Sequence, residues 1–200
     1  MKLYSGACER NRIPIQRVLS RLFLAPASIL EIASGTGMHA AYLAETMPHV
    51  VWQPSDVSPE ALASITAWRE DSGLSNLQPP IRVDVSEPNW STTVSSASFD
   101  GIFNANMVHI APWVVAQGVF QGSANLLESG EPLMFYGPFR FDGGMSESNQ
   151  HFHESLVERD PRWGIRDIEA MCAEAESAGF LLDACHALPA NNHFVVFRRT

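Results

Sequence analysis

Long hydrophobic runs are missing from this sequence of 200 residues. No apolar run reaches the roughly 18 residues that a membrane-spanning helix needs. The first residues, MKLYSGACERNRIPIQ, also lack the apolar core of a secretory signal peptide. We therefore expect a cytoplasmic protein without a membrane partner.

Cysteine is scarce as well. The three residues, Cys8, Cys172 and Cys185, lie far apart and form no C-x-x-C pair. An odd count at this spacing indicates neither a disulfide framework nor a zinc site. His151 and His153 stand at strand spacing with no third ligand nearby in the sequence. We predict that the protein has no metal site.

Positive charge is also in short supply. Lys and Arg number 13 against 22 Asp and Glu, so the net charge is −9, and no dense basic cluster occurs. Proteins that bind nucleic acid usually carry a basic face. We therefore expect a small-molecule substrate and no nucleic-acid partner. The apolar content of 46% argues against disorder, and the length suits one domain over residues 1–200.

Apolar runs and helical periodicities alternate along most of the chain, which is typical of βαβ units and a parallel sheet. The last two predicted strands, 180–186 and 193–199, are joined by a loop too short for a helical crossover, so they should be antiparallel. The prediction is an α/β fold: a doubly wound, Rossmann-like, mostly parallel seven-stranded sheet with a terminal antiparallel hairpin. Residues 1–25 are expected to form a helix and lid, and residues 137–166 a loop on the substrate side.

Two glycines follow the first predicted strand, 28–33. Gly35 and Gly37 permit backbone turns that side chains would block, and they let a ligand approach the backbone. The N–H groups at the start of the next helix can then hold an anionic or polar group. The run from Gly35 to Ala40, GTGMHA, also fits the dinucleotide pattern G-x-G-x-x-G/A, although a glycine loop alone equally fits a tight turn.

Polar residues close the next strands. Asp56 follows the second strand, and a carboxylate there can accept hydrogen bonds from both hydroxyls of a ribose. Asp84 closes the third strand, where it can accept a bond from an adenine amino group beside the Val85 N–H. Asn104 ends the fourth strand. Glu31 lies inside an apolar strand, so it needs a partner, either the loop or an amino group of the ligand.

This ordered set resembles the class I S-adenosylmethionine-dependent methyltransferases over residues 29–136. Their motif, acidic-x-G-x-G-x-G, corresponds here to Glu31-Ile32-Ala33-Ser34-Gly35-Thr36-Gly37, with Ala33 at the first glycine position. The resemblance implies S-adenosyl-L-methionine as cofactor. The residues expected to bind it are Glu31, Ala33, Ser34, Gly35, Gly37, His39, Asp56, Val57, Asp84, Val85, Asn104 and Arg12.

A narrower resemblance spans nearly the whole chain. The segments ERNR, WQPSD, NMVHIAPW, YGP, RDPRWGIRD and PANN, which begin at residues 9, 52, 106, 136, 159 and 189, are similar to a small methyltransferase-like family catalogued as a domain of unknown function. This resemblance implies the fold and the cofactor but not the substrate.

The methyl acceptor should lie at the ends of the fourth and fifth strands. Methyl transfer from a sulfonium is an in-line displacement, which needs a base only if the acceptor must lose a proton. His109 is the candidate base because the ordinary pKa of histidine lies near neutrality, although a packed or helix-capping histidine also fits the sequence. Asn106 is expected to orient the acceptor or the loop, and Tyr136 to line the pocket. Trp163 and Arg166 are expected to brace the substrate-side segment.

Two other functions fit part of the sequence. A nicotinamide-dependent oxidoreductase shares the glycine loop, but Asp84, the short chain and the terminal hairpin argue against it. A protein that binds S-adenosylmethionine without catalysis shares the whole cofactor motif, and only an open pocket for the acceptor would distinguish the enzyme from it. We expect a monomer or a homodimer.

Overall fold

The computed structural model describes residues 1–200, and the chain forms a mostly parallel seven-stranded sheet with antiparallel strands at its C-terminal end. This confirms the predicted fold class. In sheet order the strands are β3 (Ile81–Arg82), β2 (Val50–Asp56), β1 (Ala27–Ile32), β4 (Gly101–Ala105), β5 (Pro132–Gly137), β9 (Asn192–Arg199) and β8 (Phe180–Leu188). Two compact units make up the chain. The first contains Met1–Asp84 with Ala97–Asn104, and the second contains Val85–Ser96 with Ala105–Thr200.

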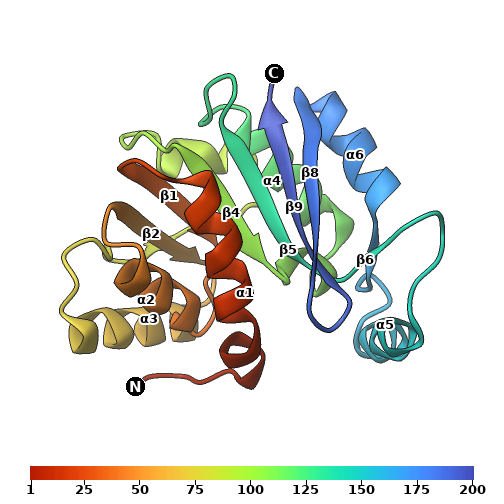
Figure 1. Cartoon of the computed structure of the whole chain (residues 1–200), viewed down its shortest axis with the longest axis horizontal. Helices are drawn as coiled ribbons and strands as arrows, with labels where there is room; N and C mark the ends of the chain where they lie inside the picture. Colours follow the sequence, from red (N-terminus) through yellow and green to blue (C-terminus); the bar gives the residue numbers. More distant parts are fainter. The chain divides into compact units, whose positions relative to one another are not determined.

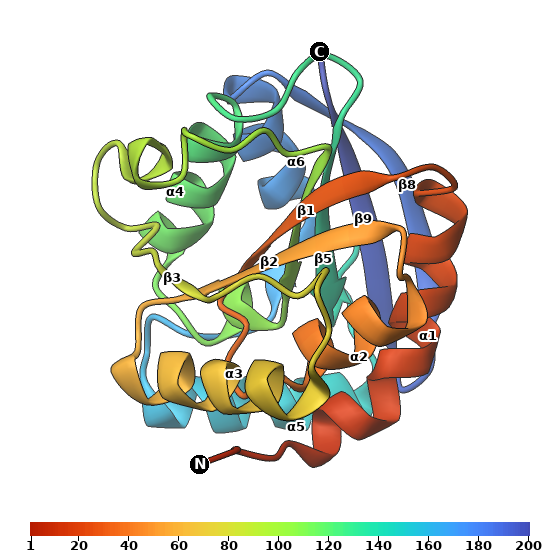
Figure 2. The same cartoon turned by 90° about the vertical axis from the view of Figure 1, so that its left-hand side faces the viewer.

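Three helices accompany the strands of the first unit: α1 (Gly6–Leu22), α2 (Met38–Thr46) and α3 (Pro59–Ser72). They run next to one another, with α2 between α1 and α3 (Figure 2). The helix α1 begins at Gly6, because Ser5 caps it by accepting a bond from the Cys8 N–H. Ser58 caps α3 by accepting from the Ala61 N–H, with Pro59 in the first turn.

The strand β1 lies between two parallel neighbours in this unit. It pairs with β2 in the register Ile29 to Trp52 and with β4 in the register Ile32 to Asn104. Its last four residues are buried, which agrees with their apolar character except at Glu31. Because the strand order reverses direction at β1, the carboxyl ends of β1, β2 and β4 frame the crevice where open α/β sheets bind ligands.

The second unit holds the antiparallel strands. The strand β9 pairs antiparallel with both β5 and β8, which confirms the predicted hairpin. Two helices, α4 (Trp113–Ser123) and α6 (Ile168–Ser177), pack against each other, and α6 also packs on β8. Asp167 caps α6, with its side chain accepting from the Glu169 N–H. No helix of the chain has the length and apolar character needed to cross a membrane.

The segment 137–166 is not the continuous loop that the sequence predicts. It contains β6 (Phe139–Arg140) and the 13-residue helix α5 (Glu147–Arg159), which Figure 1 shows end-on at its lower right. A further strand, β7 (Arg166–Asp167), pairs in parallel with β6. The pattern missed α5 because this helix buries only Asn149 and Leu156, so it has no apolar stripe. His151 and His153 therefore lie on a helix and not on a strand.

An aromatic cluster supports the second unit, and we expect its centre to dominate stability there. The Phe120 ring of α4 lies 5.3 Å from Phe135 of β5 and 5.3 Å from Phe197 of β9. Phe120→Ala should lower the free energy of unfolding by about 3–5 kcal/mol, measured by urea denaturation. Phe152→Ala on α5, where the side chain is 43% exposed, is the control and should cost far less. Equal losses would contradict this packing.

Candidate functional site

The turn after β1 has a left-handed backbone at three positions. The φ angles are +56° at Ala33, +56° at Gly35 and +84° at Gly37. A left-handed conformation costs an alanine roughly 1–2 kcal/mol, whereas glycine adopts it freely. Ala33 therefore keeps the backbone shape expected of a glycine at this position of the motif.

Backbone and side-chain hydrogen bonds tie this turn to the end of β2. The Ser34 N–H donates to the Ser55 carbonyl over 2.8 Å, and the Ser55 hydroxyl donates to the Glu31 carbonyl over 2.7 Å. The Gly35 N–H donates to Asp56 Oδ2 over 2.9 Å. Ser55 was not among the predicted site residues. The sequence indicated its role in holding the turn only through its position directly before Asp56.

Asp56 holds two segments at once. Its Oδ2 accepts from Gly35, and its Oδ1 accepts from the Ser58 N–H over 2.9 Å at the start of α3. A carboxylate offers about four lone-pair sites, so these two bonds leave capacity for the hydroxyls of a ligand. The predicted ribose-binding residue thus also orders the turn that surrounds it.

Two glycines of the turn differ in what surrounds them. A Cβ built on Gly37 would lie 2.9 Å from the Ile65 Cα, so the close approach of α3 requires glycine there. A Cβ built on Gly35 would meet nothing within 4 Å. Gly37 therefore serves packing, and Gly35 borders free space in which a ligand can approach the backbone.

Glu31 has an internal partner. Trp52 Nε1 donates to Glu31 Oε2 over 2.8 Å, and both side chains are buried. Burial raises the pKa of the Glu31 carboxyl to about 7, and the hydrogen bonds from Trp52 and Ser34 act in the opposite direction. The sequence left open whether Glu31 orders the protein or binds the ligand. Its bond to Trp52 supports a role in ordering the protein. The sequence did not identify Trp52 as the partner; it indicated only that a buried carboxylate needs a hydrogen-bond donor.

Asn104 carries an unpaired acceptor at the end of β4. Its side-chain amide donates to the Ile32 carbonyl over 2.9 Å, and its Oδ1 is buried without a partner. Buried polar atoms normally have partners, so an orphan calls for an explanation such as a missing ligand. For two other residues predicted to bind the cofactor, only their burial bears on the prediction: Asp84 is half-buried after β3, and Val57 is 45% exposed. Val85 belongs to the second unit, where it is buried.

His39 and Arg12 have partners within the helices. His39 Nε2 lies 2.7 Å from Asn11 Oδ1, which joins α2 to α1, and burial lowers the pKa of His39 to about 4. The Arg12 guanidinium lies 4.8 Å from the centre of the Tyr42 ring. Arg12 also lines a hollow of about 250 Å³ with Tyr42 and Trp68. Asn11, which lies in the ERNR segment but was given no role there, is therefore the residue that orients His39.

The three residues predicted to face the acceptor come together in the second unit. The Asn106 N–H donates to the Tyr136 carbonyl over 2.8 Å, and Asn106 precedes the short 3-10 helix η2 (Met107–His109). A Cβ built on Gly137 would lie 2.5 Å from His109 Nε2 and 3.2 Å from Asn106 Oδ1. Glycine at position 137 therefore lets the histidine and the asparagine meet the end of β5.

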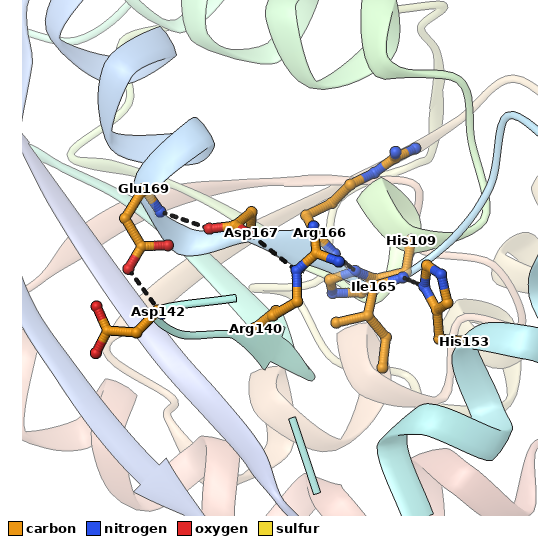
Figure 3. A network of polar contacts seen from close by, with 8 residues as sticks. All are labelled: His109, Arg140, Asp142, His153, Ile165, Arg166, Asp167 and Glu169. Atoms are coloured by element: carbon orange, nitrogen blue, oxygen red, sulfur yellow. Dashed lines mark hydrogen bonds and ion pairs between the residues drawn. The ribbon is translucent and has the colours of Figure 1, made fainter. Parts of the chain in front are cut away.

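His109 is enclosed rather than open. Its residue exposure is 1%, and its ring lies 5.1 Å from the Phe139 ring. Burial, with the positive charge of Arg166, lowers the pKa of His109 to about 3. The imidazole is consequently neutral at neutral pH. Figure 3 shows its surroundings, including Arg140, whose guanidinium pairs with Asp167 over 2.9 Å.

Arg166 braces the segment around η2, in addition to the substrate-side segment for which the sequence predicted it. Its Nε donates to the Val108 carbonyl over 2.7 Å, and its guanidinium also donates to the carbonyls of Ala111 and Arg162. It lies over the Trp113 ring, 5.6 Å from the ring centre. These contacts fix the segment that carries His109.

Comparison with known proteins places the chain in a family. Residues 2–199 match the family described as "Protein of unknown function (DUF938)". The chain belongs to this family. The match covers nearly all of the chain, which agrees with the narrower of the two resemblances found in the sequence.

Solved structures show the same fold at low sequence identity. An O-methyltransferase family protein from Burkholderia thailandensis is 14% identical, with a TM-score of 0.80, over 97% of this chain and 57% of that one. An O-methyltransferase family 2 protein from Planctomyces limnophilus, solved with apigenin, is 16% identical, with a TM-score of 0.71, over 90% of this chain and 52% of that one. This chain therefore spans little more than half the length of either protein.

A smaller protein matches end to end. A candidate sarcosine dimethylglycine methyltransferase from Galdieria sulphuraria is 13% identical, with a TM-score of 0.73, over 100% of this chain and 92% of that one. At such identities the likeness concerns the fold. The predicted fold of the class I methyltransferases is confirmed.

The two glycines of the turn give the first test of the site. Gly35→Ala and Gly37→Ala both place an alanine at positive φ, so the backbone cost of about 1–2 kcal/mol is shared. Only Gly37→Ala also pushes a Cβ into the Ile65 backbone, and overpacking of this kind costs roughly a further 1–3 kcal/mol. Chemical denaturation should rank Gly37→Ala as clearly the less stable variant. The same loss in both would contradict the difference in packing.

Glu31 gives a pH-dependent test. Its pKa is about 7 in the folded chain against an ordinary 4.5, so the unfolded chain releases the proton first as pH rises. The neutral carboxyl contributes fully to the free energy of unfolding below about pH 4.5, and this contribution is lost as the pH rises to about 7. The difference between the two pKa values limits the contribution to about 3 kcal/mol. Glu31→Gln keeps an acceptor for Trp52 and removes this titration. The wild type should lose stability relative to the variant between pH 5 and pH 8. A constant difference over that range would show that Glu31 is already ionised in the fold.

Proposed function

We propose that this chain is an S-adenosylmethionine-dependent methyltransferase that transfers a methyl group to a nitrogen, oxygen or sulfur atom of a small molecule by in-line displacement. The observation that carries the proposal is the left-handed turn from Ala33 to Gly37, held by Asp56 at the point where the strand order reverses. The methyltransferase fold of the solved relatives supports it.

The residues of the turn fit such a cofactor. Asp56 would accept the ribose hydroxyls while it keeps its bonds to the backbone, and the open space at Gly35 would admit the ligand. The orphan Oδ1 of Asn104 would accept an N–H from the amino-acid part of the cofactor. Asp84 would accept a hydrogen bond from the adenine. Val57 and Val85 would also contact the cofactor, as the family resemblance implies. The bound cofactor would supply an electrophilic methyl group on a sulfonium.

The chain's own task in this reaction would be alignment. Displacement at a methyl carbon needs the acceptor in line with the leaving sulfur and shielded from water. Asn106 would orient the acceptor through its side-chain amide, and Tyr136 would line the pocket. The net charge of −9 supports a small molecule over nucleic acid as the acceptor.

Binding without catalysis is the second candidate function. The observation in its favour is the enclosure of the acceptor-side residues, because His109 is 1% and Tyr136 3% exposed. Transfer of radioactive methyl from labelled S-adenosylmethionine to a small-molecule extract separates the two functions once binding is established. Labelled product would support the enzyme, whereas tight binding without any product would favour the binding protein.

Calorimetric titration with S-adenosylmethionine and S-adenosylhomocysteine tests the cofactor. We expect a dissociation constant on the order of micromolar for the wild type, corresponding to about −8 kcal/mol. Asp56→Ala should weaken it at least about tenfold, because hydrogen bonds to a charged group contribute roughly 1.5–3 kcal/mol each.

The control is Glu70→Ala, which removes one exposed carboxylate of α3 and should leave binding unchanged. Since Asp56 also orders the turn, unfolding curves of the ligand-free variants are needed to show that the loss is not one of folding. Failure of the wild type to bind either compound would overturn the cofactor assignment. Full affinity in Asp56→Ala would remove only the ribose contact.

A further inference from the structure

Two histidines hold the backbone that leads into β7. Three consecutive N–H groups of this segment are engaged: Gly164 donates to the His109 carbonyl over 2.9 Å, Ile165 to His153 Nδ1 over 3.1 Å, and Arg166 to His109 Nδ1 over 3.4 Å. Figure 3 shows the imidazoles of His109 and His153 at Ile165 and Arg166. The segment thus connects α5, through His153, to η2, through His109.

These bonds determine which nitrogen carries the hydrogen. A backbone N–H donates, so each Nδ1 is the nitrogen without a hydrogen, and a neutral imidazole then carries its hydrogen on Nε2. In His109 the Nε2 is buried without a protein partner, next to Gly137. Protonation of His109 would put a second donor opposite the Arg166 N–H and would break that bond.

Most of the groups around His109 also oppose its protonation; a backbone hydrogen bond at Gly164 raises its pKa, but burial and Arg166 outweigh it. The charged group that faces it is the Arg166 guanidinium, which the carbonyls of Val108, Ala111 and Arg162 hold in place. Phe139 from β6 and Gly137 from β5 contribute no charge. A positive neighbour and an apolar ring both oppose a second positive charge.

We infer that His109 is a neutral imidazole locked with its hydrogen on Nε2, with Arg166 and His153 as positioning residues, so that the methyl acceptor must be nucleophilic without a base from this histidine. The acceptor class follows from the remaining candidates. Asn106 offers an amide and Tyr136 a phenol, and neither is a base at neutral pH. The acceptor is therefore a thiolate, an uncharged amine or an oxygen that is already ionised. This inference rests on the proposed methyltransferase function.

Nitrogen NMR of the ligand-free chain tests the lock. Protein labelled with ¹⁵N-histidine would be titrated from pH 5 to pH 8 with free histidine as the internal reference, and the signals of His109 would be identified by their loss in His109→Gln. We expect an unprotonated Nδ1 and a protonated Nε2 in His109, both unchanged across this range while the reference titrates. A midpoint within the range, or a hydrogen on Nδ1, would overturn the inference.

A pair of variants tests the positioning role of His153. His153→Asn keeps an acceptor, because the Asn Oδ1 stands close to the place of the His Nδ1, whereas His153→Ala removes it. The His109 signals should stay as in the wild type in the first variant and shift toward a mixture of tautomers in the second. Identical His109 signals in both would contradict the role of His153. The NMR experiments use no cofactor, so their outcome is independent of the calorimetric test. If the NMR results contradict the lock, the inferred acceptor class is wrong. If calorimetry shows no binding, the proposed methyltransferase function is wrong.

Discussion

The hydrogen bond from the Gly35 N–H to the Asp56 carboxylate, 2.9 Å long, couples the end of β1 to the end of β2. The turn that it closes is left-handed even at Ala33, where this backbone conformation is unfavourable for an alanine. The second oxygen of Asp56 holds the Ser58 N–H and with it the start of α3. One carboxylate thus organises a turn, a strand end and a helix start. The residue proposed to recognise the ribose is therefore also the residue that shapes the place where the ribose would lie, which is the preorganisation that tight ligand binding favours.

In the second unit, one network of hydrogen bonds likewise holds the residues proposed to face the acceptor. Two imidazoles and one carbonyl accept the three N–H groups of residues 164–166, and the Arg166 guanidinium holds the carbonyls beside η2. Such a network fixes His109 in one tautomer within an environment that disfavours charge. For a displacement at a methyl carbon, rigid alignment is the larger requirement, and a base is dispensable when the acceptor is already a nucleophile. The geometry of each unit is consistent with a protein that positions groups more than it moves protons.

The parts of the fold that follow from local pattern could be predicted from the sequence. Alternating strands and helices, the glycine turn and the closing hairpin all depend on neighbouring residues. The helix α5 could not be predicted, because its polar surface carries no periodic apolar stripe. The lowered pKa of His109 could not be predicted from the sequence either. Its expected pKa near neutrality assumed exposure, whereas the residue that bonds and repels it, Arg166, lies 57 positions further along the chain. The bond between Trp52 and Glu31 likewise depends on strand register, which a single sequence does not specify.

The most direct test of the central claim is a crystal structure of the chain grown with S-adenosylhomocysteine. The account predicts the nucleoside against the turn of residues 33–37, with the ribose hydroxyls on Asp56 and a donor of the amino-acid part on the Asn104 Oδ1 that has no partner in the ligand-free chain. A nucleoside bound elsewhere, with Asp56 engaged only by Gly35 and Ser58, would contradict it. In that case the left-handed turn would be a structural device alone, and the chain would share the methyltransferase fold without its cofactor site.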